Sequence, residues 1–305
     1  MNLQVGMASL LCAILPSLAG ADPLRLVPAA ADAVARVENP RALYNAIYEH
    51  ELFQDFLKID TVAAFYDTTN FRRAQQFIAF LEKELGHERL DLLDRLAGGG
   101  ATVAAQFEQK AVLLVVEAKD EELLKQFVAL ARKLANQELS RQDAKATIQA
   151  RSYRDLETLH LGTDLHAARA GSALLISNQE SVLHKALDLY RDGAKDSLAQ
   201  TKSLAEMKSH LPKEPLLWGA LNIEQIKTIQ NVKNTLNTLG LDPVTMFAIG
   251  GVVDVIKRSP YVCAGLAREG NNLHLRVAMP RGSDGMAPLA AMFLPADDRG
   301  TLPML

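Results

Sequence analysis

An apolar run followed by an amphipathic helix recurs along this chain. In the clearest copy, residues 111–134 read AVLLVVEAKDEELLKQFVALARKL, and Val112–Val116 form an apolar run of strand length. Asp120 stands where a carboxylate can cap a helix, and apolar residues then return at helical spacing. The pattern predicts a strand that leads directly into a helix with one apolar face.

Three further copies show the same order of apolar strand, capping residue and amphipathic helix. Their strands begin near Val34, Leu174 and Leu216, and their helices have predicted caps at Asn39, Ser177 and Asn222. The spacing between copies is unequal, which argues against a solenoid or a propeller of fixed repeat length. A true internal duplication and a merely common local design both remain open, because strand-helix units recur widely.

The chain after residue 146 changes to short strands joined by tight turns. Turn residues occur at Arg154-Asp155, Gly162-Thr163-Asp164, Gly171-Ser172 and Gly270-Asn271. Adjacent strands joined in this way, interleaved with long helices, predict an α+β fold. We therefore expect mostly antiparallel sheet, with long amphipathic helices packed on one face and about four strand-then-helix units.

The predicted α+β domain covers residues 22–280, either as one body or as two subdomains, 22–145 and 146–280. Beyond it, residues 281–305 read RGSDGMAPLAAMFLPADDRGTLPML, with Gly and Pro punctuation and little periodicity. We expect this segment to be an irregular C-terminal tail that packs across the sheet, or the start of a region that this chain lacks.

The first 21 residues resemble a signal peptide. Met7–Leu15 is apolar, Pro16 follows, and Ala19-Gly20-Ala21 fits the small-x-small rule for cleavage before Asp22. The segment departs from the usual pattern in having no Lys or Arg before the apolar stretch. Ala19 and Ala21 are the small residues of this site, and cleavage falls between Ala21 and Asp22. It predicts an exported protein, periplasmic or extracellular, with no membrane span in the mature chain. The alternative is an uncleaved N-terminal helix that anchors the protein in the envelope.

Charge and cysteine content narrow the classes of partner. The chain has 33 Lys and Arg against 36 Asp and Glu, a formal net charge of −3, and no basic run. This argues against binding to nucleic acid or to an anionic membrane surface. Signal cleavage would leave Cys263 as the only cysteine, so we expect no disulfide within the mature chain. Because Cys263 lies in an apolar strand, we expect a buried thiol and no nucleophile.

The histidines offer weak candidates for metal chemistry. His50-Glu51 and His87-Glu88 each begin like a helical zinc motif, but neither has a second His four residues on. His160 and His166 flank a predicted turn and can face one another, yet the sequence shows no third ligand beside them. The alternative is a pair of exposed hairpin histidines. We therefore predict no metal site.

Motifs for other chemistry are also missing. Gly98-Gly99-Gly100 follows a helix and precedes a strand, the reverse of the order in a phosphate-binding loop, so we interpret it as a hinge. No serine nucleophile motif occurs, and no set of polar residues converges. The sequence predicts no cofactor, and it identifies no catalytic residue.

Three stretches resemble a known family: DLLDRLAGGGATVAAQFEQKAVLLVVEAKDEELLKQF, LHAARAGSALLISNQESVLHKALDLY and SPYVCAGLAREGNNLHLRVAMPRGSDG. They are similar to an uncharacterised family of exported bacterial proteins, a domain of unknown function. The resemblance implies α+β units and a location outside the cytoplasm, with no assigned activity.

We therefore expect an exported non-catalytic module that binds or scaffolds another component of the cell envelope, either a protein or a ligand. Two alternatives stay open at this stage. The first is a hydrolase-type enzyme whose site is scattered or lies in a missing C-terminal part. The second is an envelope protein anchored by its uncleaved N-terminal helix.

Overall fold

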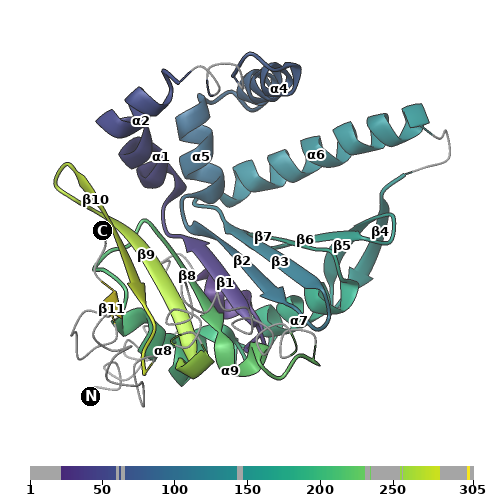
Figure 1. Cartoon of the computed structure of the whole chain (residues 1–305). Coiled ribbons are helices and arrows are strands. Elements are labelled where there is room, and N and C mark those ends of the chain that lie inside the picture. Colours follow the sequence, from purple (N-terminus) through teal and green to yellow (C-terminus); the bar gives the residue numbers. More distant parts are fainter. Residues whose placement is uncertain are drawn as a thin grey trace, which may run out of the picture.

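One antiparallel sheet of eleven strands runs through the protein (Figure 1). The computed structural model describes residues 22–59, 62, 66–142, 147–230, 234, 255, 257–281 and 301–302. In spatial order the strands are β11 (Thr301–Leu302), β10 (Asn272–Ala278), β9 (Tyr261–Glu269), β8 (Leu217–Asn222), β1 (Ala33–Val37), β2 (Gly100–Gln106), β3 (Ala111–Glu117), β7 (Ala173–Ser177), β6 (Leu165–Ala170), β5 (Leu156–Leu161) and β4 (Gln149–Tyr153). The predicted α+β class with a mostly antiparallel sheet is confirmed.

The described helices form two groups, one at the top and one at the bottom of the view in Figure 1. The first group is α1 (Pro40–Tyr48), α2 (Glu51–Phe56), α4 (Thr69–Leu85), α5 (Arg89–Ala97) and α6 (Glu121–Gln142). The second is the short helices η1 (Pro23–Leu26) and η2 (Leu198–Gln200) with α7 (Glu180–Arg191), α8 (Lys202–Ser209) and α9 (Ile223–Ile226). Among the helices that the structure describes, none combines the length and apolarity needed to cross a bilayer.

The four predicted strand-helix units all contribute a strand to this sheet. β1 and β3 run in the same direction because each pairs antiparallel with β2, whereas β7 and β8 run in the opposite direction. The helices α1 and α6 therefore leave one end of the sheet, and α7 and α9 leave the other. A shared origin of the four units is not confirmed.

Local capping chemistry starts most of these helices as predicted. The Asn39 side chain accepts a hydrogen bond from the Ala42 amide at 2.9 Å, and Asp120 accepts one from the Leu123 amide at 2.9 Å. The predicted cap at Ser177 is wrong, because β7 continues through that residue and α7 begins after Gln179. The Ser177 hydroxyl instead accepts a hydrogen bond from the Gln179 amide.

Tight turns join the strands of the second half. Arg154 and Asp155 both adopt positive φ, at 48° and 62°, the conformation that a two-residue hairpin requires. The predicted turns at Gly162, Gly171 and Gly270 are also present between consecutive strands. These hairpins set the register of β4–β7 and of β9–β10.

The glycines 98–100 let the chain pass close to β3. A Cβ on Gly99 would lie 2.6 Å from Cγ of Glu117, and Gly100 has a φ of 105°. Only glycine tolerates both conditions without a shift of the backbone. The triple glycine is a tight connection between α5 and β2, as its place between a predicted helix and a predicted strand indicated.

Strands from both predicted subdomains belong to this one sheet. β3 of the first range pairs with β7 of the second, and β1 pairs with β8. From the predicted C-terminal tail, Thr301 and Leu302 pair with Ala278 and Val277 at the edge of the sheet. Residues 282–300 and 303–305 of that tail lie outside the described part of the chain.

The hydrophobic core lies on one face of the sheet, beneath η1, α7 and α8. Its fully buried members, all 2% exposed or less, include Leu24, Val27, Leu113, Val115, Leu175, Leu183, Leu187 and Trp218. Along β3 the buried positions alternate with positions on the opposite face, as the two-residue period of a strand requires.

A buried arginine links the start of the described chain to the core. The Arg36 guanidinium lies 2.7 Å from carboxylate oxygens of Asp22 and of Glu38, and its side chain is 8% exposed. The Trp218 indole donates a hydrogen bond to Glu38 at 2.6 Å. These contacts hold Asp22 and η1 against the sheet.

Glu117 is a buried acid on the core face, 2% exposed. It accepts a hydrogen bond from the Ser172 hydroxyl. Loss of hydration raises the pKa of the Glu117 carboxyl above its ordinary value, and the hydrogen bond from Ser172 and the charge of Arg36 offset part of this increase. The folded protein therefore holds a proton on Glu117 more tightly than the unfolded chain does.

This raised pKa predicts a pH-dependent effect of Glu117→Gln. Between the ordinary and the raised pKa the unfolded chain releases the proton first, so the wild-type protein loses stability as pH rises through that window. The glutamine variant has no such titration, so the difference in free energy of unfolding, variant minus wild type, should increase as the pH rises above the ordinary glutamate pKa of about 4.3. Chemical denaturation at several pH values measures the difference. A difference that stays constant or shrinks with rising pH would contradict this account.

Candidate functional site

The face of the sheet opposite the core is apolar across nearly its whole width. Paired residues on neighbouring strands form one row from β10 to β5: Val277, Ala264, Gly219, Ala35, Val103, Leu114, Ile176, Ala167 and Leu159. An antiparallel sheet with one solvated face ordinarily places polar side chains there. Here no residue in the row has a polar side chain.

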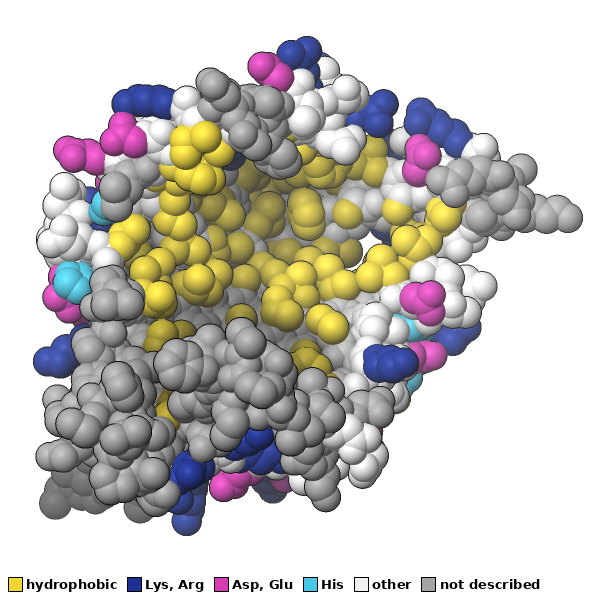
Figure 2. All heavy atoms as spheres, in the orientation of Figure 1, with side chains coloured by type: hydrophobic (Ala, Val, Ile, Leu, Met, Phe, Trp, Pro, Cys, Tyr) yellow, Lys and Arg dark blue, Asp and Glu magenta, His cyan; other side chains and the backbone are white. Residues whose placement is uncertain are grey.

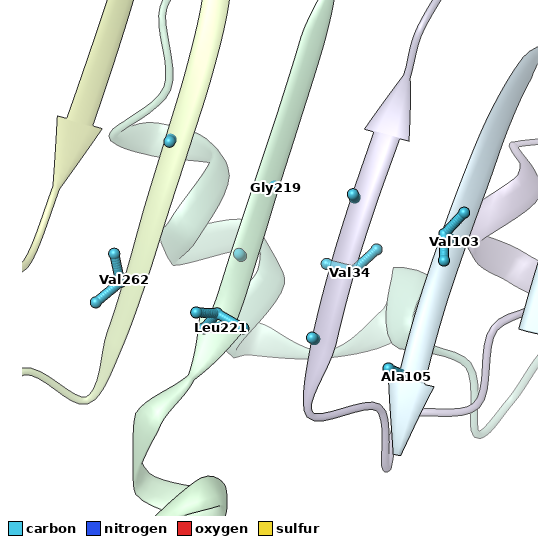
Figure 3. Close-up of a pocket in the computed structure, with 10 residues that line it drawn as sticks. Val34, Val103, Ala105, Gly219, Leu221 and Val262 are labelled. Carbon is cyan, nitrogen blue, oxygen red and sulfur yellow. The ribbon is translucent and has the colours of Figure 1, made fainter. Parts of the chain in front are cut away.

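The row is hollowed where it crosses β9, β8 and β1. Ala35, Gly219 and Ala264 carry one side-chain carbon or none, so the backbone of β1, β8 and β9 forms a low floor (Figure 3). Val103 and Leu221 stand beside it, 42% and 39% exposed. The hollow has a volume of about 330 Å³, and we call it the apolar trough; its lining residues are Ala33, Val34, Ala35, Val103, Ala105, Gly219, Ala220, Leu221, Val262 and Ala264.

Helix α6 passes over the other half of the same face. A second hollow, of about 540 Å³, lies between this helix and strands β5–β7, and we call it the α6 mouth. Its floor includes Leu159 and Ala167, the last two positions of the apolar row. Figure 2 shows apolar side chains gathered across this concave face, with the helices of the first group above them.

The rim of the α6 mouth is charged. The basic residues are Lys125, Arg132, Lys133 and Arg169, and the acidic residues are Asp155 and Glu157. Arg132 pairs with Glu157 at 2.9 Å, and Arg169 pairs with Glu121 at 2.8 Å. The mouth therefore joins an apolar floor to a rim that can hold a polar or charged group.

The histidines of the β5–β6 hairpin lie on the core face. His160 and His166 are 4% and 5% exposed, so the alternative of exposed hairpin histidines is wrong. They face each other as expected, with their Nδ1 atoms 2.9 Å apart. Glu180, at the start of α7, lies beside them. Periodicity could not reveal this third residue, because only the packing of α7 on the sheet brings it to the hairpin.

The remaining sequence candidates do not assemble into a site. His87 pairs with Asp91 at 2.8 Å within one turn of helix. Cys263 is 1% exposed, and burial raises the pKa of its thiol to about 11, which keeps it protonated. Of the predicted cleavage-site residues, Ala19 and Ala21 lie outside the described part of the chain. Asp22 caps η1 by accepting a hydrogen bond from the Leu24 amide.

A family profile described as "Protein of unknown function (DUF3352)" matches residues 74–254. The matched segment covers more than half of the chain and contains strands β2–β8, which carry most of the apolar row. The chain belongs to this family. The family assignment confirms the predicted resemblance to a domain of unknown function, and its description states no activity.

Crystal forms I and III of TP0453 are two solved structures that resemble this chain weakly. Form I has a TM-score of 0.42 and 12% identity over 90% of this chain and 84% of the other. Form III has a TM-score of 0.42 and 13% identity over 92% of this chain and 89% of the other. These scores are too low to transfer a fold or a function to the DUF3352 chain. No curated protein gave a significant match.

Proposed function

We propose that this DUF3352 protein is a non-catalytic module that binds a lipid, with the acyl chains lying in the apolar trough. The observation that supports this proposal is the row of apolar residues, without a polar side chain, across nine strands on the face opposite the core, where Ala35 and Val103 are exposed. Surfaces of this kind on soluble domains mark binding sites, because exposed contiguous apolar area is unfavourable in water.

Acyl chains fit the trough better than an extended peptide does. An extended peptide laid on this face would bring its own N–H and C=O groups against the side chains of Ala35, Val103 and Leu221, none of which can form a hydrogen bond with them. Each unpaired backbone group removed from water lowers the affinity by about 1–3 kcal/mol. Acyl chains have no such groups, so their contact with the floor carries no comparable penalty.

The dimensions of the row suit a lipid with two chains. Nine neighbouring strands span about 38 Å, whereas one leaflet of a bilayer provides about 15 Å of hydrocarbon. Burial of ten methylenes stabilises a complex by about 8 kcal/mol. The translational and rotational freedom lost on association costs roughly 4–15 kcal/mol, which is of similar size. A single short chain should therefore bind weakly, and a lipid with two long chains should bind measurably.

A binding role also agrees with the chemistry of the trough. Its lining residues are Ala, Val, Leu and Gly, and none of these can act as an acid, a base or a nucleophile. The rim of the α6 mouth places charged groups beside the end of the row at Leu159 and Ala167, where a lipid headgroup can lie. Hydrolase chemistry would require reactive groups that the described trough does not contain.

Native mass spectrometry tests the proposal directly. We expect the delipidated protein to form a 1:1 complex with a phosphatidylglycerol carrying two long acyl chains, and none with its dihexanoyl analogue at equal concentration. Equal binding of the two lipids would show that the headgroup alone is recognised. Absence of any complex with the long-chain lipid would refute a lipid-binding trough.

Export completes the proposed function, because a lipid-binding module of the envelope must leave the cytoplasm. Its support is the sequence pattern at Ala19-Gly20-Ala21. When the full reading frame is expressed in a bacterium, we expect the mature protein to begin at Asp22 and to be recovered from the periplasm or the medium. Mass spectrometry of the intact protein measures this start. A membrane-bound protein that retains Met1 would instead establish the anchored alternative.

A further inference from the structure

Three side chains that can bind a metal meet on the core face of the sheet. His160 comes from β5, His166 from β6 and Glu180 from the first turn of α7. One ligand atom from each of the three lies within 4.8 Å of the other two. The two histidines are paired across the hairpin, and their Nδ1 atoms are 2.9 Å apart.

The hydrogen bonds around His166 leave its Nδ1 unprotonated, with a free lone pair. Its Nε2 lies 3.0 Å from the carbonyl oxygen of Thr163, which can only accept a hydrogen bond, so Nε2 carries the proton. The unprotonated Nδ1 then points at His160. A metal-bound histidine characteristically donates its second N–H to a backbone carbonyl in this way.

His160 has partners for either tautomer. Its Nε2 lies 2.9 Å from Oγ1 of Thr158, and that hydroxyl can in turn donate to the carbonyl of Arg151 at 3.4 Å. With the proton on Nε2, the Nδ1 lone pairs of the two histidines face each other and need a cation between them. With the proton on Nδ1, the pair is joined by a hydrogen bond and no metal is needed. The surroundings therefore allow a metal ion to replace the proton that lies between the two Nδ1 atoms.

We propose that His160, His166 and Glu180 bind a divalent transition-metal ion, with Zn²⁺ as the best fit. Two imidazoles and one carboxylate form a common zinc ligand set, and neighbouring ligands of tetrahedral zinc lie about 3.4 Å apart. The histidines would separate by about 0.5 Å to reach that spacing. The Glu180 carboxylate lies 3.9 Å from Nε2 of His160, so it would move toward the two Nδ1 atoms; its position at a helix start and its side-chain exposure of 38% allow this movement.

Glu180 is the most exposed of the three proposed ligands, so an ion would enter from its side. Arg151 lies 3.5 Å and His184 3.7 Å from Oε1 of Glu180, so both compete with the metal for the carboxylate. A bound ion would join the β5–β6 hairpin to α7. It would therefore raise the thermal midpoint.

Calorimetric titration of the chelator-treated full chain with ZnCl₂ tests this site. We expect one ion per chain, a higher thermal midpoint with zinc, and d–d absorption typical of tetrahedral coordination when Co²⁺ replaces Zn²⁺. His166→Ala and Glu180→Gln should each weaken zinc binding at least tenfold, about 1.4 kcal/mol. His274→Ala, at a histidine on β10 whose side chain is 49% exposed, is the matched control and should bind as the wild type does.

Two outcomes would overturn the proposal. The first is the absence of zinc binding to the wild-type chain, and the second is zinc binding that both site variants retain at wild-type strength. If His166→Ala fails to fold, Glu180→Gln decides, because that residue is half-exposed and its replacement keeps the same shape. The apolar trough lies on the opposite face, so lipid binding and zinc binding can fail independently.

Discussion

Ala35→Trp should weaken the binding of a two-chain lipid at least tenfold, about 1.4 kcal/mol. Ala35 lies at the centre of the apolar row, paired with Gly219 on one side and Val103 on the other, and its side chain is exposed. An indole at this position fills much of a hollow of about 330 Å³ and occupies the space that an acyl chain needs. Fluorescence titration with a lipid that carries a fluorescent acyl chain measures the affinity.

The matched control is Ala79→Trp, which introduces the same side chain at an exposed position of α4. It should bind lipid as the wild type does. Because both alanines are exposed, both variants should keep the thermal midpoint within about 2 °C of the wild type. Wild-type affinity in a folded Ala35→Trp variant would place the lipid elsewhere on the protein.

Leu124→Ala should lower the free energy of unfolding by about 2–5 kcal/mol. Leu124 is 1% exposed in the first turn of α6, where the helix that covers the mouth leaves the sheet. Its truncation removes buried methyl groups and leaves a cavity that the neighbouring strand and helix cannot fill. Urea denaturation measures the loss.

Leu165→Ala makes the same truncation at a side chain that is 43% exposed. Its effect should stay below about 1 kcal/mol, because much of that leucine already contacts water. Phe127, on the same helix as Leu124, is only partly buried, so its replacement by alanine should have an intermediate effect. Equal losses for Leu124→Ala and Leu165→Ala would show that α6 is not anchored by its buried first turn.

Local features of the fold were predictable because neighbouring residues determine them. Asn39 and Asp120 cap helices through groups within three residues, and Arg154-Asp155 forms a hairpin between adjacent strands. The cap at Ser177 failed for a non-local reason: pairing with β3 and β6 extends β7 through that residue. The antiparallel α+β class followed from the same local signals.

The trough and the histidine site depend on contacts that the sequence pattern does not contain. The apolar residues of β2 and β3 look alike whether helices cover both faces of the sheet or only one, so periodicity could not show that Val103 and Val112 are exposed. A Gly or an Ala in a strand likewise gives no sign that it forms the floor of a hollow. Glu180 reaches His160 only through the packing of α7.

Paramagnetic relaxation by a spin-labelled lipid tests the central claim most directly. With the label on the acyl chain of a bound two-chain phospholipid, the amide signals of Ala35, Val103 and Gly219 should broaden strongly. The amides of Leu183 and Leu187 in α7, on the far side of the sheet, should stay sharp. Broadening centred on α7, or spread evenly over the surface, would contradict a lipid-binding trough.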